Sequence, residues 1–508
     1  MTTVEQLQFT GAFIRALPGD PRSDNHTRQV RQACYSRVEP TAVPAPELLV
    51  LVPEVAALLG LETSPELVQV LAGNRVVPGM APYAACYGGH QFGTWAGQLG
   101  DGRAITLGEV RHAGKTWELQ LKGAGPTPYS RTADGRAVLR SSLRELVCSE
   151  AMFHLGVPTT RALSLVLTGQ PVMRDLLYDG HPAQEPGAVV CRVAPSFLRF
   201  GSYEIHAARE DRETLRTLVD FTLATWFPGK TVGEMFAEVA QRTAWLLAEW
   251  MRVGFVHGVM NTDNMSILGL TIDYGPYGWL EPFDLTWTPN ITDAANRRYR
   301  FGNQPAIAHW NVAQLAKALL PVCDQDSVAM IRASIDAFPR DFSSLYRHTM
   351  LRKLGLSGRG DTIVEDDALL TALGELMQSI EVDYTLWFRR LAEPERLPEA
   401  IYGEVTSIER AMISRWLDRY RARVAIEGIS EAERAVRICE VNPIYVPRNY
   451  LVQEVIAATE RGDRKELVAL LDVLRDPYRE RAGLEHFTQK RPEWARAKPG
   501  CSMLSCSS

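Results

Sequence analysis

The chain has 508 residues, of which 46% are hydrophobic and 23% charged, and its formal net charge is -5. This length predicts a large bilobal core or two to three folded domains. The acidic balance argues against a nucleic-acid-binding protein, and no apolar run approaches the roughly 20 residues of a membrane span. The segment 1–20 has no basic stretch followed by an apolar run, so we expect no secretion and a cytoplasmic location.

The first half of the chain is rich in strand-forming residues. Residues 1–85 mix short apolar runs with prolines, which predicts an extension packed on the core. In the segment 86–205, alternating apolar residues and turn signals predict strands within 94–110, 115–125, 162–168 and 188–194. Apolar residues at helical spacing predict one amphipathic helix over 137–155.

The second half is dominated by helical patterns. They extend over 206–475 and include the runs 213–227 and 232–254. The fold class is therefore α+β, with a β-rich first lobe that contains one helix and a mainly helical second lobe. This is the order of a bilobal protein kinase, although other α+β proteins share it.

The eight cysteines are scattered and show no zinc-binding spacing. Two of them, Cys501 and Cys506, lie in the polar tail 476–508. A thiol in such a tail is expected to be accessible to redox chemistry. The alternative, that both cysteines are merely tolerated there, stays open.

A glycine-rich turn, Gly100-Asp101-Gly102-Arg103, lies between two strand-like segments. Glycines let the backbone approach a phosphate closely, and the arginine can hold a phosphate through two parallel hydrogen bonds. The same residues also fit an ordinary hairpin turn, since Asp-Gly is a common hairpin signal.

Lys122 ends the apolar strand-like run 117–121, and Glu145 lies in the middle of the next predicted helix. Kinases use a strand lysine of this kind to hold phosphates, with a helix glutamate as its ion-pair partner. A solvated surface pair of little energetic consequence is the alternative.

The segment 257–264, HGVMNTDN, resembles the kinase catalytic loop H-R-D-x-x-x-x-N. Val259 occupies the position of the catalytic aspartate and cannot accept a proton. A carboxylate returns at Asp263, directly before Asn264, so we expect that the proton acceptor has moved to Asp263.

Asp273-Tyr274-Gly275 follows the strand-like run 268–272 and resembles the D-F-G sequence, whose aspartate holds magnesium. Asn264 and Asp273 are thus the predicted ligands of one hard divalent cation. Arg192 and Arg199, seven residues apart, are candidates for binding a terminal phosphate or a leaving pyrophosphate.

These motifs together resemble the selenoprotein O (YdiU) family of pseudokinase-fold protein adenylyltransferases. The resemblance rests on the segments 87–109, 119–145, 192–204, 257–276 and 442–454. It implies that ATP binds in a flipped orientation and that AMP passes to a Ser, Thr or Tyr hydroxyl of a protein, with Mg²⁺ or Mn²⁺. The resemblance also implies the use of UTP with manganese. We expect no nucleic-acid or membrane partner.

The resemblance also assigns site residues. It places the proton acceptor on Asp263, the metal ligands on Asn264 and Asp273, and the nucleotide contacts on Gly100, Gly102, Arg103, Lys122, Asp134, Gly135, Arg192 and Arg199. Cys506 stands where eukaryotic members carry selenocysteine. Some members have a cysteine after the Asp-Tyr-Gly sequence that can pair with the tail, but the loop 283–290 has none, so we do not expect that disulfide.

Two other functions stay open at this point. A phosphotransferase would use the same metal ligands but present the γ-phosphate. A non-catalytic pseudokinase scaffold would bind nucleotide weakly or without metal, and the pair Asn264 and Asp273 argues against it.

Overall fold

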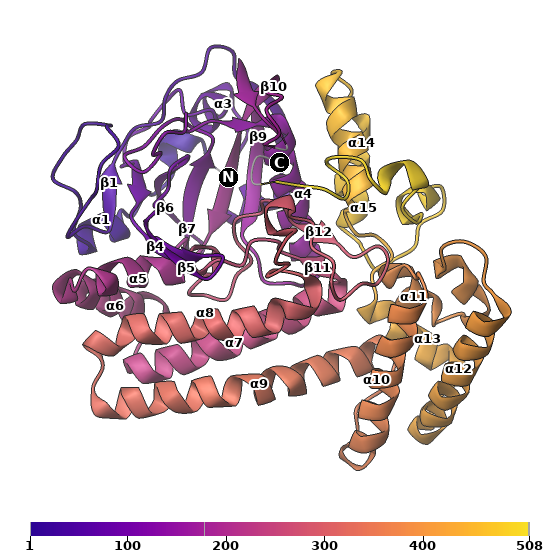
Figure 1. The fold of residues 1–508 in the computed structure, drawn as a ribbon. Coiled ribbons are helices and arrows are strands. Elements are labelled where there is room, and N and C mark those ends of the chain that lie inside the picture. The colour runs from indigo at the N-terminus through magenta and orange to yellow at the C-terminus, as the bar shows by residue number, and fades with distance from the viewer. Residues whose placement is uncertain (1, 177, 506–508) are drawn as a thin grey trace.

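The computed structural model describes residues 2–176 and 178–505. It has a mixed α+β architecture in which a strongly twisted antiparallel sheet stands over long helices (Figure 1). The eight-stranded sheet has the order β1-β3-β6-β7-β10-β9-β2, and β8 pairs with β10. The strands of this sheet are β1 (Tyr35–Arg37), β2 (Glu47–Leu51), β3 (Tyr83–Ala85), β6 (Ala104–His112), β7 (Lys115–Lys122), β8 (Ala137–Val138), β9 (Arg161–Arg174) and β10 (Ala183–Ala194).

Both faces of the sheet are covered, which explains why the stretch 188–191 of the central strand β10 is apolar on both sides. Along β10 the side chains alternate: Val190 packs in one cluster with Leu143 of α4 (Leu139–His154), and Val189 packs in another with Leu67 of α3 (Pro65–Leu71). This alternation is the period of two expected of a strand. The N-terminal segment adds α1 (Ala12–Ala16), α2 (Pro53–Leu58) and the strands β1 to β3.

Two smaller antiparallel pairs of strands are separate from the eight-stranded sheet. One is the hairpin of β4 (Gly88–Gln91) and β5 (Thr94–Gln98), and the other joins β11 (Phe255–Val256) to β12 (Gly278–Trp279). The strands and the helix predicted for 86–205 are confirmed. The expected strand at 268–272 is wrong, because this segment turns at Gly269 (φ +70°) and only Thr271 makes isolated bridges.

Three long helices, α7 (Val232–Val253), α8 (Gln304–Leu319) and α9 (Gln325–Lys353), lie side by side beneath the sheet (Figure 1). Thr231 caps α7 and forms a capping box with Glu234, and Gly254 ends the helix at φ +75°. Because α7 stops there, the chain enters β11 and then the segment 257–264. The other helices are α5 (Phe200–Ala208), α6 (Arg212–Trp226), α10 (Ile363–Ser379), α11 (Tyr384–Arg390), α12 (Ser407–Glu427), α13 (Glu431–Val441), α14 (Asn449–Glu460) and α15 (Lys465–Leu474).

The tail residues 476–505 pack against the rest of the chain, which corrects the expectation of an accessible thiol at Cys501. Cys501 is 2% exposed, and burial raises the pKa of its thiol to about 11. Leu504 donates from its backbone N–H to Pro289 O at 2.9 Å and accepts from Ile291 N at 2.8 Å. Cys506 lies outside the described residues. None of the helices in the described part of the chain is long and apolar enough to cross a membrane.

Candidate active site

A cleft of about 700 Å³ opens between the central strands β7 and β10, with the loops 100–103 and 129–136, and the segment 259–276. Sheet-derived loops form one wall and the loop after α7 forms the other. Most of the predicted site residues line this cleft: Gly100, Gly102, Arg103, Lys122, Asp134, Gly135, Arg192, Asp263, Asn264 and Asp273. Glu145 and Arg199 are buried beside it, at 1% and 2% exposure.

The glycine-rich turn 100–103 packs closely on the next loop of the same wall. Gly100 has φ +75°, and a Cβ there would lie 2.4 Å from Cγ of Tyr129. Gly135 has φ +70°, and a Cβ there would meet the backbone of Gly125 at 2.2 Å. Neither position has room for a side chain. The neighbouring Asp134 forms an ion pair with Arg174 at 2.8 Å.

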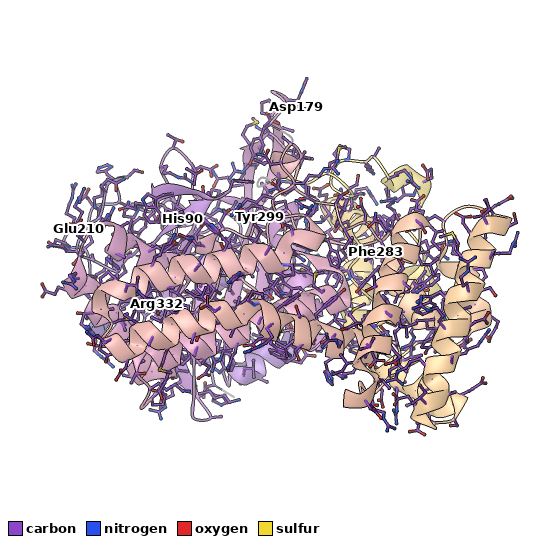
Figure 2. All side chains as sticks on the ribbon, turned by 60° about the horizontal axis from the view of Figure 1, so that its bottom comes forward. His90, Asp179, Glu210, Phe283, Tyr299 and Arg332 are labelled. Carbon is purple, nitrogen blue, oxygen red and sulfur yellow. The ribbon has the colours of Figure 1, made fainter. Side chains whose placement is uncertain are left out.

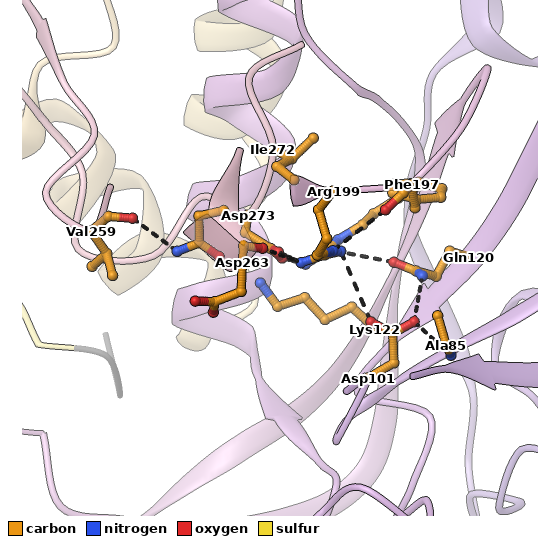
Figure 3. A network of polar contacts seen from close by, with 12 residues as sticks. Ala85, Asp101, Gln120, Lys122, Phe197, Arg199, Val259, Asp263, Ile272 and Asp273 are labelled. Atoms are coloured by element: carbon orange, nitrogen blue, oxygen red, sulfur yellow. Dashed lines mark hydrogen bonds and ion pairs between the residues drawn. The ribbon is translucent and has the colours of Figure 1, made fainter. Parts of the chain in front are cut away.

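Behind the cleft, cationic and anionic side chains form a buried network, and Figure 3 shows the part around Arg199, Asp273 and Asp101. Lys122 Nζ lies 2.5 Å from Glu145 Oε2, and Arg192 Nε lies 2.6 Å from Glu145 Oε1. Arg192 Nη2 reaches Asp273 Oδ1 at 2.8 Å, and Arg199 Nη1 reaches Asp273 Oδ2 at 2.5 Å. The ion pair expected between Lys122 and Glu145 is therefore present, and both arginines converge on Asp273.

Burial and charge set the protonation of this network. Burial lowers the pKa of Lys122 to about 8, although Glu145 opposes the shift. Burial alone would raise the pKa of Asp273, but the positive charges of Arg192, Arg199 and Lys122 outweigh burial and hold that pKa well below its usual value. Asp273 is thus ionised. Its backbone has φ +56°, which lies in the left-handed region. Such a backbone is uncommon for a residue other than glycine and is found at strained functional positions.

The loop 257–264 is held by its own hydrogen bonds. His257 Nε2 donates to Ile272 O at 2.9 Å, and its Nδ1 accepts from Val259 N at 3.3 Å, so the ring is neutral. Burial lowers the pKa of His257, in agreement with this neutral form. Asn264 Nδ2 donates to Val259 O at 2.9 Å, which leaves the amide oxygen of Asn264 for another partner.

Asp263 lies in the short 3-10 helix Thr262–Asn264 and is 7% exposed. Its Oδ1 is buried and has no hydrogen-bond partner among the described residues, and its Oδ2 accepts from Gln91 Nε2 at 3.4 Å. Burial raises the pKa of Asp263 to about 7, while Arg199 opposes the shift. A buried carboxylate with a raised pKa and a free oxygen is suited to accept a proton.

The donor atoms at this site fit a hard divalent cation. They are the Asp273 carboxylate and the Asn264 amide oxygen, with the unpartnered Asp263 Oδ1 close by in the chain. Within the described residues, no group of three or more His, Cys, Asp or Glu side chains is arranged to hold a metal alone. A cation here would also need oxygens from phosphates and water, which is how Mg²⁺ is commonly bound.

Sequence reasoning missed several residues that support this site. Gln91 contacts Asp263, and Gln120 joins Asp101 to Arg192 through hydrogen bonds of 3.3 and 3.1 Å. Asn261 accepts from Tyr299 OH at 2.6 Å. The paired glycines 88–89 before Gln91 were a usable signal of close backbone approach, whereas nothing in the local sequence connects Tyr299 to Asn261.

Comparison with known proteins identifies the family of this chain. A family model described as Protein adenylyltransferase SelO matches residues 22–475. A protein nucleotidyltransferase YdiU from Aromatoleum aromaticum is 55% identical, covering 99% of this chain and 100% of its own length. Its counterpart from Tolumonas auensis is 54% identical with 99% of both chains covered, and that from Rhodopirellula baltica is 53% identical with the same coverage. The chain therefore belongs to the SelO family of protein adenylyltransferases.

Proposed function

We propose that this enzyme has a protein-kinase-like site and transfers AMP from ATP to Ser, Thr or Tyr hydroxyls of proteins. The observation that carries the proposal is Asp263, a cleft-lining buried carboxylate with an unpartnered oxygen and a raised pKa. The valine at position 259, where a kinase has its base, lines the same cleft. The carboxylate available to the acceptor hydroxyl is thus displaced from the kinase position.

In this proposal, one wall of the cleft binds the nucleotide and the other binds the metal. The glycines Gly100, Gly102 and Gly135 let the backbone approach the nucleotide, and Arg103 and Asp134 contact it. Lys122, oriented by Glu145, binds phosphate oxygens together with Arg192 and Arg199. Asn264 and Asp273 would hold Mg²⁺ or Mn²⁺, which would neutralise phosphate charge.

The proposed reaction is a displacement at the α-phosphorus of ATP. The acceptor hydroxyl oxygen forms a bond to the α-phosphorus, and the bond from that phosphorus to the β-phosphate bridging oxygen breaks. Asp263 takes the hydroxyl proton, and pyrophosphate leaves with both electrons of the broken bond. Lys122, Arg192 and Arg199 supply positive charge for the leaving group, so catalysis depends on positioning and electrostatics.

We propose the divisions 1–85, 86–205, 206–475 and 476–508 as N-terminal extension, nucleotide-binding lobe, catalytic lobe and tail. We also propose a cytoplasmic location, where ATP is present and thiols stay reduced, which suits the free cysteines of the described chain. UTP is a second candidate nucleotide, because the resemblance to the family implies it.

Intact-mass measurement tests the chemistry. After incubation with ATP and Mg²⁺ or Mn²⁺, an acceptor protein or the enzyme itself should gain the mass of an AMP moiety. A gain equal to one phosphate would instead show a kinase, and no gain with any nucleotide would favour a scaffold. Parallel reactions with UTP separate AMP transfer from UMP transfer.

A further inference from the structure

The turn of the β4–β5 hairpin forms part of the cleft wall next to Asp263. Gln91 and Phe92 both line the cleft. Phe92 has φ +51° and keeps 39% of its surface exposed. A bulky residue in the left-handed region is strained, and such strain persists where the surroundings impose it and often where function uses it.

Hydrogen bonds fix this turn to the catalytic loop. Phe92 N donates to Tyr299 OH at 2.9 Å and to Asn261 Oδ1 at 3.3 Å. His90 N donates to Thr262 Oγ1 at 2.7 Å, directly beside Asp263 in the chain. Tyr299 and His90 lie on the same side of the long helices (Figure 2). The aromatic ring of Phe92 is therefore presented at a fixed place relative to Asp263.

Arg298 lies against the same turn. A Cβ on Gly93 would be 3.2 Å from Cζ of Arg298, and the guanidinium group lies 4.9 Å from the centre of the Trp310 ring. Arg298 Nε is buried without a hydrogen-bond partner, and no carboxylate of the described residues lies within ion-pair distance of this side chain. The acidic residue of its own loop, Asp293, instead accepts from the backbone N–H groups of Arg298 and Tyr299, at 2.9 and 2.7 Å.

Two more arginines flank Arg298 and also have no carboxylate partner in the described chain. Arg297 Nη1 donates to Thr286 Oγ1 at 3.2 Å, and Arg300 Nη1 donates to Arg297 O at 3.0 Å. Three like charges within four residues repel one another, and they stand on a chain whose net charge is -5. Such a local excess attracts an oppositely charged partner.

We propose that Phe92, Arg297, Arg298 and Arg300 form an acceptor surface that docks the protein segment carrying the reacting hydroxyl and prefers acidic side chains beside it. This inference rests on the proposed function. Arginine pairs with carboxylates through two parallel hydrogen bonds, and an exposed aromatic ring packs against the neighbouring chain. Because the turn is fixed to the catalytic loop, acidic residues close to the hydroxyl in sequence are favoured over distant ones.

The test uses two synthetic serine peptides of equal length, one flanked by glutamates and one by glutamines, with the full-length protein. Transfer from α-labelled ATP gives kcat and KM for each peptide, and fluorescence anisotropy gives peptide affinity without turnover. We expect the acidic peptide to be preferred by about five- to tenfold, mainly through KM. Arg298→Gln and the triple variant Arg297→Gln/Arg298→Gln/Arg300→Gln should remove this preference while nucleotide affinity is kept.

Arg340→Gln is the matched control, because Arg340 is an exposed arginine on α9 with 81% of its side chain accessible. It should leave the preference intact. Charge reversal by Arg297→Glu/Arg300→Glu should shift the preference toward a lysine-flanked peptide. Equal use and equal binding of the acidic and neutral peptides by the unmodified protein, or a preference that survives the triple variant, would overturn the acceptor surface. If no protein or peptide is labelled at all, the proposed function fails, and the anisotropy measurement still decides the docking claim.

Discussion

Arg199 donates to Asp273 Oδ2 at 2.5 Å, so the proposed metal ligand is already neutralised by an arginine before nucleotide and metal bind. Arg192 takes the other oxygen of Asp273 at 2.8 Å. In our account both arginines must exchange this carboxylate for phosphate oxygens when the nucleotide enters. We therefore expect Asp273 to matter for stability as well as for catalysis.

Replacement of Asp273 should cost both activity and stability. Asp273→Ala removes the carboxylate that we propose binds the metal, and it leaves Arg192 and Arg199 buried without this partner. We therefore expect loss of transfer and a fall of about 3 kcal/mol in the free energy of unfolding. Urea unfolding and transfer assays with Mg²⁺ and Mn²⁺ measure the two effects. Asp361→Ala, which breaks an exposed pair with Arg359, is the control and should change neither by much. Substantial transfer by folded Asp273→Ala protein would disprove the metal assignment.

Lys122 and Glu145 should act as one unit. Because their ion pair is buried, either Lys122→Ala or Glu145→Ala should lower transfer by about a hundredfold or more. The double variant should be little worse than the poorer single variant, as expected for coupled residues. A double-mutant cycle on kcat/KM checks this, and losses that multiply would show that the residues have separate tasks.

Gln91 should position Asp263. Its amide donates to Asp263 Oδ2, so Gln91→Leu should lower kcat by about tenfold while the KM for ATP changes little. Gly89→Ala should be more harmful, because the new Cβ would lie 2.5 Å from Asp263 Oδ1. Gly374→Ala is the control for an added methyl group, because Gly374 lies on α10, its φ is not positive, and a Cβ there would meet nothing within 4 Å. Equal kcat for Gly89→Ala and Gly374→Ala would contradict the positioning role.

His206 should make stability depend on pH. Burial lowers the pKa of His206 to about 4, against about 6.5 in the unfolded chain, so the unfolded state binds the proton more readily. The contribution of neutral His206 to the free energy of unfolding is thus fully present above pH ~6.5. It is lost as the pH falls toward ~4, and the loss is roughly 3 kcal/mol at most. Urea unfolding at pH 7 and pH 5 should show a smaller decrease for His206→Gln than for the unmodified chain. An identical pH dependence in the two proteins would show that His206 is not the cause.

Strong local patterns made much of the fold and site predictable. Alternating apolar residues identified β7 and β10, and helical spacing identified α4 and α7. The contacts between distant segments were not predictable, because no local pattern encodes them. Examples are the convergence of Arg192 and Arg199 on Asp273, and the bond from Tyr299 to Asn261. The strand expected at 268–272 did not form because the chain turns at Leu268 and Gly269, and Thr271 makes only isolated bridges, to Thr159 and Met265.

The most direct test of the account asks which phosphorus of ATP is attacked. The protein is incubated with divalent metal and ATP labelled either at the α- or at the γ-phosphate, and the label on protein is counted beside that released as pyrophosphate. We predict that α-labelled ATP labels protein, that γ-labelled ATP leaves protein unlabelled and yields labelled pyrophosphate, and that Asp263→Asn suppresses both. Label on protein from γ-labelled ATP would show a kinase with a displaced base and would contradict the account.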